Sequence, residues 1–480
     1  MSDNVRSATL ATFAGVVAIA APYGPTTVAP ALAAGSLGLL IILASWQPVV
    51  VLGLIAATLP LYHEPFLVRD SVLAPSELLL AAAVVGTLVR ATGAGPTNAV
   101  PTATSARLLA GLRRLNTPFG LIATVALCVL SVLGLVLLVL VDPDARSAGL
   151  RELRWTLVEP LVFVGLLLWH ATTKRERAYL AGAFVGGGLV VALWGLVDAL
   201  AGGGVSAGGV TRASGPFPHP NAYGLYLLRP VAFAAAFLVI RRARAVSAWS
   251  ACGIGGAALV ASFSRSAALG LFIGFIVLWP WLSARLRLLT TAGAAALGTA
   301  LILVAGDRAV GGSGQDSLAL RGDIWRAGLA MIRDRPVLGY GPDQFLYVYS
   351  PRYVDPAAWA ERFTAHGHNL IIDAWVRVGI IGAVCVVLAL ALIARAGRVV
   401  AGAGNERGID PLGAAAVVAL VAAGVQALVD NGYFVHDLAM SAWLLGWLAF
   451  ATPGRRHRRG ALLNESSRNR GGRTGRVPPL

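Results

Sequence analysis

Apolar runs that recur along almost the whole chain constrain its fold more than any other feature. The sequence of 480 residues is 57% hydrophobic and only 13% charged, which is too little charge for the surface of a soluble protein of this size. An apolar run of about 20 residues is long enough to cross the hydrocarbon core of a bilayer, which is roughly 30 Å thick. The sequence therefore predicts an all-α fold, a polytopic transmembrane helical bundle.

The positions of these runs predict roughly 12–14 membrane spans. Most of them precede a long polar segment: we expect spans near residues 8–23, 28–45, 48–62, 73–90, 119–141, 155–171, 177–200, 222–240, 247–263, 266–282 and 287–305. Three more follow that segment, near residues 370–394, 411–429 and 436–452. The polar segment, residues 306–369, is long for a loop, which favours a functional role for it, and we expect it to contain short helices.

Composition divides the chain into three regions. Residues 1–200 hold the N-terminal spans, with a Gly-, Pro-, Thr- and Ala-rich linker near residues 92–117. Residues 201–452 hold the remaining spans and the large loop, residues 306–369. Residues 453–480 are basic and polar, which is typical of a disordered tail that lies near anionic lipid.

The net charge of +16 lies mainly in short loops between the predicted spans and in the tail. Arginine and lysine cluster in alternate loops, near residues 107–114, 174–177, 241–244, 285–287 and 395–407. Because basic loops of membrane proteins face the cytoplasm, we expect both termini to be cytoplasmic and the loops 201–221, 306–369 and 430–435 to be extracytoplasmic. This distribution favours contacts with lipid headgroups over binding to nucleic acid.

Three polar segments fall on the predicted extracytoplasmic side. The first is a turn-rich loop, residues 212–221, and the second is Ser264-Arg265-Ser266, at the border between two apolar runs. The third is the large loop, which ends in His366-Gly367-His368-Asn369 directly before an apolar span. Imidazoles at that point have water on one side and lipid on the other. Their position favours chemistry between a lipid-borne substrate and a soluble group.

Within the large loop, a helical stretch begins near Arg321. Trp325, Leu329 and Ile332 recur at helical spacing, which favours an amphipathic helix lying on the membrane surface. The stretch ends at Asp334-Arg335-Pro336, before a glycine-rich turn.

Several of these polar residues also have a purely structural explanation. Arg265 could anchor a helix end by reaching to the membrane surface, and Arg212 could be a solvated loop residue. His219 lies between two prolines, which favours a structural role over a catalytic one. Asn221 could cap the following helix as readily as it could contact a ligand.

Arg321 could likewise form a local ion pair with Asp323 at the start of its helix. A metal site at His366 and His368 is disfavoured, because no cluster of carboxylates or cysteines accompanies them. The three cysteines of the chain are scattered through apolar runs, so we expect them to be small core residues.

The chain resembles the O-antigen ligase and polymerase superfamily, bacterial transferases of lipid-linked glycans, at five segments between about residues 205 and 450. Each segment is short, but five in the right order are fairly specific. The segments are Arg212…Gly215-x-Phe217-x-His219-Pro220-Asn221, Ser264-Arg265-Ser266 before a span, Arg321…Trp325…Pro336-x-x-Gly339-x-Gly341-Pro342…Phe345, His368-Asn369 followed by Trp375…Gly379-x-x-Gly382, and Asp430-Asn431. The resemblance implies an O-antigen ligase-like catalytic region over residues 201–452, whereas the first 200 residues match only in being membrane spans.

The resemblance implies an inverting membrane glycosyltransferase, which moves a glycan from an undecaprenyl pyrophosphate carrier to a hydroxyl group outside the membrane. His368 would be the general base, a role that suits an imidazole near neutral pH. Arg212 and Arg265 would hold the pyrophosphate, with Arg321 as a third candidate, since guanidinium groups suit phosphate oxygens. No metal or other cofactor is implied. Further substrate contacts are expected from His366, which could share the work of His368, and from Asn369, Asn221, His219 and Trp325.

The same resemblance places the protein in the bacterial inner (plasma) membrane, with its active site outside. The acceptor is a second growing glycan in a polymerase and a lipid- or protein-anchored hydroxyl in a ligase. The arginine-rich, cysteine-poor composition, typical of a GC-rich bacterium without an outer membrane, tilts the prediction slightly towards polymerisation or wall-glycan attachment. The alternative is a transporter or flippase of lipid-linked oligosaccharide, a class that predicts broken or charged helices at mid-membrane and two related halves.

Overall fold

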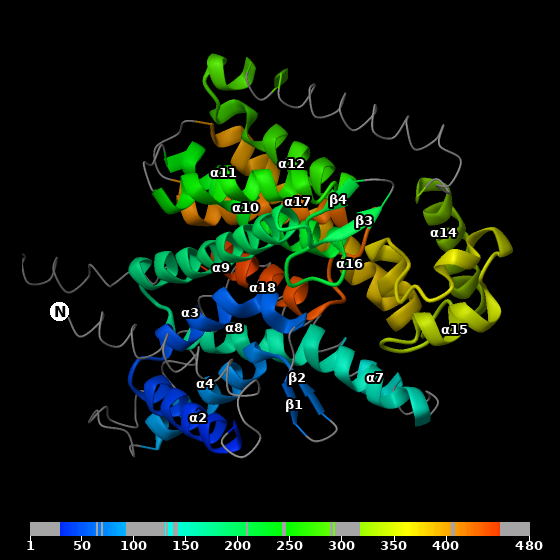
Figure 1. The fold of residues 1–480 in the computed structure, drawn as a ribbon, viewed down its shortest axis with the longest axis horizontal. Coiled ribbons are helices and arrows are strands. Elements are labelled where there is room, and N and C mark those ends of the chain that lie inside the picture. The colour runs from blue at the N-terminus through cyan, green and yellow to red at the C-terminus, as the bar shows by residue number, and fades with distance from the viewer. Residues whose placement is uncertain are drawn as a thin grey trace, which may run out of the picture.

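The computed structural model describes residues 29–63, 66–68, 71–92, 130, 133–137, 143–207, 210–241, 246–288, 291–292, 317–404 and 409–451. This part of the chain is mostly helical (Figure 1), so the predicted all-α membrane bundle is confirmed. The predicted span 8–23 and the tail 453–480 lie outside the described residues. So do most of the predicted spans 119–141 and 287–305 and nearly all of the linker 92–117.

The helices follow one another with few intervening strands. In chain order they are α2 (Ala29–Trp46), α3 (Pro48–Thr58), α4 (Pro75–Ala91), α7 (Pro143–Leu153), α8 (Glu159–His170), α9 (Lys174–Leu200), α10 (Pro220–Arg241), α11 (Val246–Ala261), α12 (Arg265–Leu278), α14 (Ser317–Asp334), α15 (Phe345–Arg352), α16 (Leu370–Ala403), α17 (Pro411–Ala427) and α18 (His436–Phe450). Two short antiparallel hairpins lie in predicted loops, β1 (Phe66–Val68) with β2 (Ser71–Leu73) and β3 (Val205–Ala207) with β4 (Val210–Arg212).

The sequence shows why several helices begin where they do. The helices α3, α4, α10 and α17 each start with a proline, whose fixed φ suits the first turn and whose missing N–H would have no partner there. At the start of α9, the Thr173 hydroxyl accepts a hydrogen bond from the Glu176 N–H, and the Glu176 carboxylate accepts one from the Thr173 N–H. This reciprocal cap satisfies two backbone donors at the helix start.

The bundle has α10 near its centre, packed against α17, α11, α12 and α9 (Figure 1). On the other side of α9 lie α3, α4 and α2, while α18 connects α17 with α8. One continuous apolar core runs through all of these helices. Residues that are far apart in the sequence therefore form one unit, because the N-terminal and C-terminal helices share that core.

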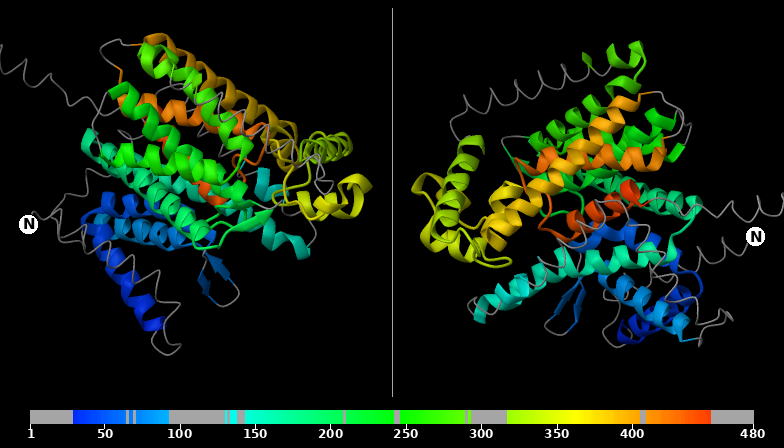
Figure 2. Two further views of the ribbon diagram at one scale, coloured as in Figure 1. Left: turned by 45° about the horizontal axis from the view of Figure 1, so that its top comes forward. Right: turned by 180° about the vertical axis from the view of Figure 1, so that it is seen from behind.

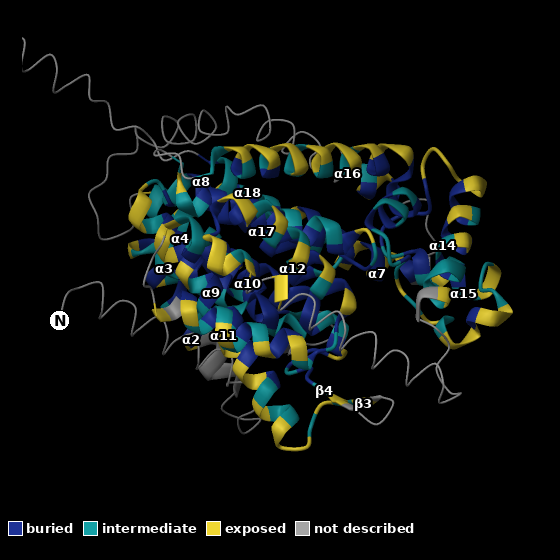
Figure 3. Ribbon diagram, turned by 90° about the horizontal axis from the view of Figure 1, so that it is seen from above, coloured by how far each residue is buried: buried dark blue, intermediate teal, exposed yellow. Residues whose placement is uncertain are grey.

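Within the described residues, four helical segments are long and apolar enough to cross a membrane: 145–170, 174–200, 220–241 and 370–403. Shorter apolar helices, among them α11, α12 and α17, lie beside them. The long helix α16 lies along one edge of the bundle, with a row of exposed residues on its outer face (Figure 3). Apolar side chains such as Val384, Val387 and Leu388 are exposed there, as expected for a surface that contacts lipid acyl chains.

The helices of the large loop lie together at one end of the bundle, which we call the loop end (Figures 1 and 2). There α14 packs on the start of α16, and α15 lies beside both. Their shared core contains Ile324, Met331, Phe345, Tyr349 and Val376. The loop that was predicted to contain short helices is therefore a packed helical layer over the described residues from 317 onwards.

The structure adds a buried face to the apolar stripe predicted on α14. Leu329 of that stripe is 56% exposed, so its contact with the membrane surface stays a prediction. Ile324, Ala327 and Met331, on a neighbouring face, are buried. The reason is that Val376 and the aromatic residues of α15 cover α14 from one side, which the sequence of α14 alone does not reveal.

Residues 143–154, which lie between the predicted spans 119–141 and 155–171, are helical. The helix α7 continues through a π-helical turn, Arg154–Val158, into α8. This helix was not predicted from hydropathy, which identifies membrane spans and does not detect polar helices. This extension brings Glu152 to the loop end, where it contacts α16.

Candidate active site

A cavity of about 300 Å³ opens at the loop end, between the start of α10, the helix α14 and the segment that leads into α16. Most of its polar side chains were singled out in the sequence, including three histidines and Arg321. The lining residues are His219, Asn221, Ala222, Leu225, Leu320, Arg321, Ile324, Glu361, Thr364, His366, His368 and Asp430. The structure therefore brings together residues that are up to about 200 positions apart in the chain.

At the centre of the cavity, His368 pairs with Asp430. The imidazole Nδ1 lies 3.1 Å from the Asp430 Oδ1. Asp430 is 2% exposed, and its carboxylate also accepts hydrogen bonds from the Arg321 guanidinium at 3.1 Å and the Ser266 hydroxyl at 3.2 Å. Burial opposes ionisation of Asp430, but the hydrogen bond from His368 and the charges of His368 and Arg321 outweigh it and lower its pKa below the usual range.

This pairing fixes the roles of the two imidazole nitrogens. An ionised carboxylate can only accept hydrogen bonds, so Nδ1 of His368 must carry the hydrogen that Asp430 receives. In the neutral imidazole the other nitrogen, Nε2, then has a free lone pair. A histidine oriented by a buried carboxylate is the arrangement in which an imidazole works as a general base.

The backbone at His368 is strained. Its φ is +48°, a left-handed conformation that costs a non-glycine residue of order 1–3 kcal/mol. Trp325 donates a hydrogen bond from its indole Nε1 to the His368 carbonyl at 3.3 Å. Asn369 caps α16 by accepting from the N–H groups of Ile371 and Ile372, at 3.0 and 3.2 Å. Trp325 and Asn369 thus hold the backbone on either side of the imidazole, and neither lines the cavity.

The other two left-handed non-glycine residues in the described chain also lie at the sequence motifs. They are Phe263, directly before Ser264, and Asp343, directly after Pro342. Strained backbone of this kind persists only where surrounding contacts enforce it, and it gathers at functional sites. Three of the five motifs found in the sequence therefore coincide with enforced backbone geometry.

The second histidine, His366, lies against the first. The two rings meet edge to face, with centroids 4.3 Å apart. Burial, together with the charge of His368, lowers the pKa of His366 to about 3. Its Nδ1 is buried and has no hydrogen-bond partner among the described residues. His366 is therefore neutral at ordinary pH and a weak base.

The turn-rich loop, residues 212–221, forms the wall of the cavity on the α10 side. Arg212 donates from Nε and Nη2 to the Ser262 carbonyl, at 2.9 and 2.7 Å, and from Nη2 to the Asn221 side chain at 2.8 Å. The Asn221 N–H in turn donates to His219 Nδ1 at 3.2 Å. Burial, followed by the charge of Arg212, lowers the pKa of His219. His219 and Asn221 line the cavity, whereas Arg212 lies behind Asn221.

The three residues of the Ser264-Arg265-Ser266 motif have different roles in the structure. Ser264 caps α12, accepting from the Ala267 N–H at 3.4 Å. Ser266 donates to Asp430, so it helps to hold the carboxylate in place. Arg265 is the first residue of α12; it is exposed and is not among the residues that line the cavity.

The local ion pair between Arg321 and Asp323, considered from the sequence, is absent from the described contacts. Arg321 instead pairs with Asp430 at 3.1 Å, and Asp323 pairs with Arg326 one turn further along α14. The sequence suggested the local pair because Arg321 and Asp323 are close in the chain. The actual partner is 109 positions away.

The glycine-rich turn of the large loop docks onto a kink in α16. At the kink, Val378 and Gly379 leave the helical conformation, so the carbonyls of Val376 and Arg377 can accept from the Tyr340 and Gly341 N–H groups, at 2.7 and 2.9 Å. Gly379 has a φ of +67° and lies against the backbone of Val337, so a side chain there would be both strained and obstructed. This docking gives the Pro336-x-x-Gly339-x-Gly341 motif a physical role.

A buried ionic network that the sequence analysis missed supports the histidine segment. Arg377 bonds to Asp373 at 2.9 Å and to Glu152 of α7 at 2.9 Å. Asp373 accepts from the Gly367 N–H at 2.7 Å, and Arg377 donates to the Ala365 carbonyl at 3.4 Å. Asp373 and Arg377 stand one helical turn apart at the start of α16, and that spacing was the only trace of the network in the sequence.

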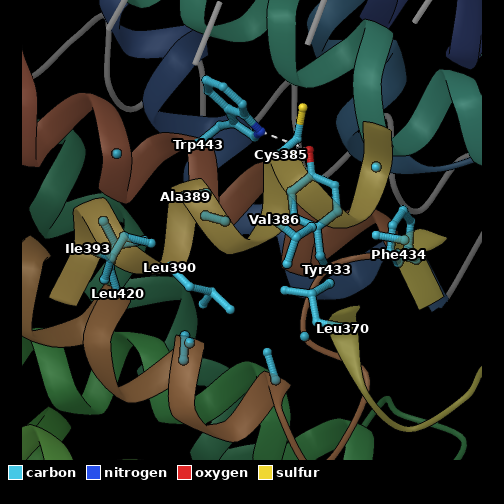
Figure 4. A pocket seen from close by; sticks show the side chains of 18 of the residues that line it. Leu370, Cys385, Val386, Ala389, Leu390, Ile393, Leu420, Tyr433, Phe434 and Trp443 are labelled. Atoms are coloured by element: carbon cyan, nitrogen blue, oxygen red, sulfur yellow. Dashed lines mark hydrogen bonds between the residues drawn. The ribbon is translucent and has the colours of Figure 1, made fainter. Parts of the chain in front are cut away.

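A second, apolar crevice of about 220 Å³ begins beside the active site (Figure 4). It lies between α16, α17 and α18, and its walls are almost entirely hydrocarbon, including Leu370, Leu390, Ile393 and Leu420. Tyr433 lies near one end, where its hydroxyl accepts a hydrogen bond from the Trp443 indole at 2.9 Å (Figure 4). Leu370 is two residues from His368, so the crevice and the cavity at the loop end are lined by the same segment of the chain.

Comparison with known proteins matches one part of the chain to a family. Residues 250–387 match the family model described as O-antigen ligase. The match begins in α11 and ends in α16, so it includes Arg265, Arg321 and His368, while Arg212 and Asp430 lie outside it. No curated protein sequence matches the chain. The O-antigen ligase match over residues 250–387, within a helical membrane bundle, supports membership of the O-antigen ligase and polymerase superfamily.

Proposed function

We propose that this protein is a membrane glycosyltransferase that moves a glycan from an undecaprenyl pyrophosphate carrier to the hydroxyl group of an acceptor. The observation that carries the proposal is the pairing of His368 with the buried, ionised Asp430 inside a cavity at the loop end. A transporter of the same lipid-linked glycan would have no use for an oriented base. The O-antigen ligase match supports this class of reaction.

The chemical step is a direct displacement. The acceptor hydroxyl gives its proton to Nε2 of His368 while its oxygen attacks the anomeric carbon of the donor sugar. The bond from that carbon to the pyrophosphate oxygen breaks, and its electron pair leaves with the lipid pyrophosphate. The anomeric carbon is inverted, and Asp430 stabilises the imidazolium that forms.

The leaving pyrophosphate gains negative charge, which cationic side chains stabilise. Arg321 lines the cavity and is the arginine nearest to the base through their shared partner, Asp430. Arg212 and Arg265 are the further proposed pyrophosphate ligands, Arg212 behind Asn221 and Arg265 one residue before Ser266. Asn221, His219 and His366 line the same cavity and would contact the sugar or the phosphate, while Trp325 and Asn369 would act by holding His368.

The apolar crevice supports a lipid-linked donor. It begins at Leu370, directly after the catalytic segment, and extends to Ile393. These residues lie on α16, which is among the helices long enough to span a bilayer. An isoprenoid chain in the crevice would place its pyrophosphate near the cavity without burying charge in hydrocarbon.

The proposed orientation puts the cavity and the loop end outside the cytoplasm of a bacterial cell, with the protein in the inner (plasma) membrane and both termini cytoplasmic. The basic loops motivate this assignment. It fits the chemistry, since the acceptor glycan or anchored acceptor would then meet the donor on the outer side.

The test is transfer by the purified protein in detergent, given undecaprenyl pyrophosphate oligosaccharide, in buffer with EDTA and no added metal. His368→Gln should lower the transfer rate by roughly 10²–10⁴-fold, the usual contribution of a general base. The matched control is His170→Gln, which changes an imidazole that bonds to Thr87 outside the cavity and should retain most of the activity. Normal transfer by His368→Gln would overturn the assignment of the base.

The length of the product separates the two members of the class. A ladder of repeat-unit multiples, formed without any other acceptor, identifies a polymerase. A single transfer that requires an added lipid- or protein-anchored acceptor identifies a ligase.

A further inference from the structure

An exposed aromatic turn, residues 359–364, forms the outer edge of the catalytic cavity. It begins at the end of the short 3₁₀ helix Pro356–Glu361, which Asp355 caps. Trp359 is 56% exposed and Phe363 is 69% exposed. Apolar side chains that are exposed next to each other form a patch of the kind that marks an interaction site.

The two aromatic rings are held in place by Arg362. Its guanidinium lies 5.1 Å from the centre of the Trp359 ring and 4.5 Å from that of the Phe363 ring. Arg362 also donates a hydrogen bond to the Trp359 carbonyl at 3.0 Å. Cation–π contacts of this kind restrict the side chains, so the turn presents a preorganised aromatic surface.

The same turn contributes two polar side chains to the cavity, Glu361 and Thr364. Among the described residues, the Glu361 carboxylate has no hydrogen-bond or ion-pair partner. It lies close enough to His219, across the cavity, for its charge to affect the pKa of that histidine. The Glu361 carboxylate is therefore available to accept hydrogen bonds from a ligand in the cavity.

The cavity is lined by charged groups of both signs, among them Arg321 of α14 and Glu361 of the aromatic turn. Arg321, with Arg212 and Arg265 as the further proposed ligands, suits a pyrophosphate, whereas the Glu361 carboxylate would repel one. Sugar hydroxyl groups, by contrast, donate hydrogen bonds to carboxylates, and the C–H face of a pyranose ring packs against aromatic rings. The turn therefore has the chemistry of the glycan end of the site.

We infer that the Trp359–Thr364 turn is a sugar-binding subsite, in which Trp359 and Phe363 stack on pyranose rings and Glu361 accepts hydrogen bonds from their hydroxyl groups. The inference rests on the proposed glycosyl transfer for its place in the reaction. The subsite takes neutral or amino sugars and disfavours uronic acids, because a second carboxylate beside Glu361 would be repelled.

The test is direct binding of two matched, lipid-free tetrasaccharides to the full-length protein in detergent, measured by isothermal titration. One tetrasaccharide is neutral, and the other carries one uronic acid in place of a hexose. We expect wild-type protein to prefer the neutral one.

Trp359→Ala and Glu361→Gln should each weaken binding of the neutral tetrasaccharide about tenfold. Glu361→Gln should also reduce the discrimination against the uronic acid. Tyr347→Ala, which removes another exposed aromatic from α15, is the matched control and should bind as wild type does.

Binding does not require turnover, so the test separates the subsite from the proposed reaction. Glycan binding that depends on Trp359 and Glu361, in a protein that transfers nothing, would leave the subsite standing and reject the transferase. Active transfer with unchanged glycan affinity in both variants would overturn the subsite. If wild-type protein bound neither tetrasaccharide, or if Trp359→Ala and Phe363→Ala only reduced recovery from the membrane, the turn would be a membrane anchor and the inference would be wrong.

Discussion

At the scale of single residues, the account depends on the carboxylate of Asp430. It accepts hydrogen bonds from three side chains, His368, Arg321 and Ser266, and from the Asn431 N–H at 2.9 Å. These donors come from four separate parts of the chain. One buried charge thereby aligns the proposed base, the proposed pyrophosphate ligand and the Ser-Arg-Ser motif.

Asp430→Asn should therefore lower the transfer rate by roughly 10²–10⁴-fold, because the amide no longer fixes the tautomer of His368 or stabilises its protonated form. Initial rates of glycan transfer check this effect. Asp323→Asn, which removes a carboxylate that pairs with Arg326 within α14, is the control. An unchanged rate in Asp430→Asn would argue against the pairing.

His366 predicts a dependence of stability on pH. Its pKa of about 3 in the folded protein lies below the ordinary value near 6.5 that it regains on unfolding. The unfolded chain therefore binds the proton first, and the free energy of unfolding should fall as the pH drops from about 6.5 towards 3. At pH 5 this loss amounts to about 2 kcal/mol. His366→Gln should abolish that part of the loss in thermal unfolding in detergent at pH 7.5 and pH 5. An equal loss in both proteins would contradict the shifted pKa.

At the scale of secondary-structure elements, the sequence predicted most of the helices. The runs near 28–45, 222–240 and 411–429 correspond to α2, α10 and α17 within a few residues, since apolar length and flanking prolines determine them. The polar helix α7 was missed, because hydropathy identifies only apolar helices. The buried face of α14 depends on α15 and α16, so it could not be predicted from α14 alone.

The kink in α16 is an element-scale feature with a testable consequence. Gly379→Ala places a side chain at φ +67° and against the backbone of Val337. It should lower the free energy of unfolding by about 1–3 kcal/mol and lower activity as well, because the turn 336–342 loses its docking site beside the His368 segment. The measurement is thermal unfolding in detergent together with the rate of transfer.

Gly402→Ala is the matched control for this substitution. Gly402 lies in the same helix and has open space around it, so alanine there should be neutral or slightly stabilising. Equal stability of the two variants would show that the kink is not held by Gly379.

At the scale of the whole molecule, the candidate active site is composed of pieces that meet only in the folded bundle. Short sequence motifs singled out His368 and Arg321, which line one cavity. The sequence could not pair His368 with Asp430, which is 62 positions away, or identify Glu152 as a partner of Arg377, 225 positions away. Such contacts depend on how α7, α14, α16 and α17 pack, and no local pattern encodes that packing.

The proposed orientation is a prediction about the whole molecule. In a variant without its three native cysteines, Ala360→Cys should react with a membrane-impermeant maleimide in intact cells, because the loop end faces outwards. Arg398→Cys, near the other end of α16, should react only after the cells are permeabilised. Both positions are exposed, so accessibility within the protein does not limit either reaction. The reverse pattern would invert the orientation and place the active site in the cytoplasm.

The proposed function requires the His368–Asp430 pair to catalyse glycan transfer from a lipid pyrophosphate. The most direct measurement is the transfer rate of purified wild-type and His368→Gln protein with undecaprenyl pyrophosphate oligosaccharide in EDTA, with release of undecaprenyl pyrophosphate measured in the same samples. The account predicts glycan product and free carrier in equal amounts from wild type, and a loss of both by roughly 10²–10⁴-fold in His368→Gln. Equal rates in the two proteins, or no transfer by wild type with any acceptor, would contradict it.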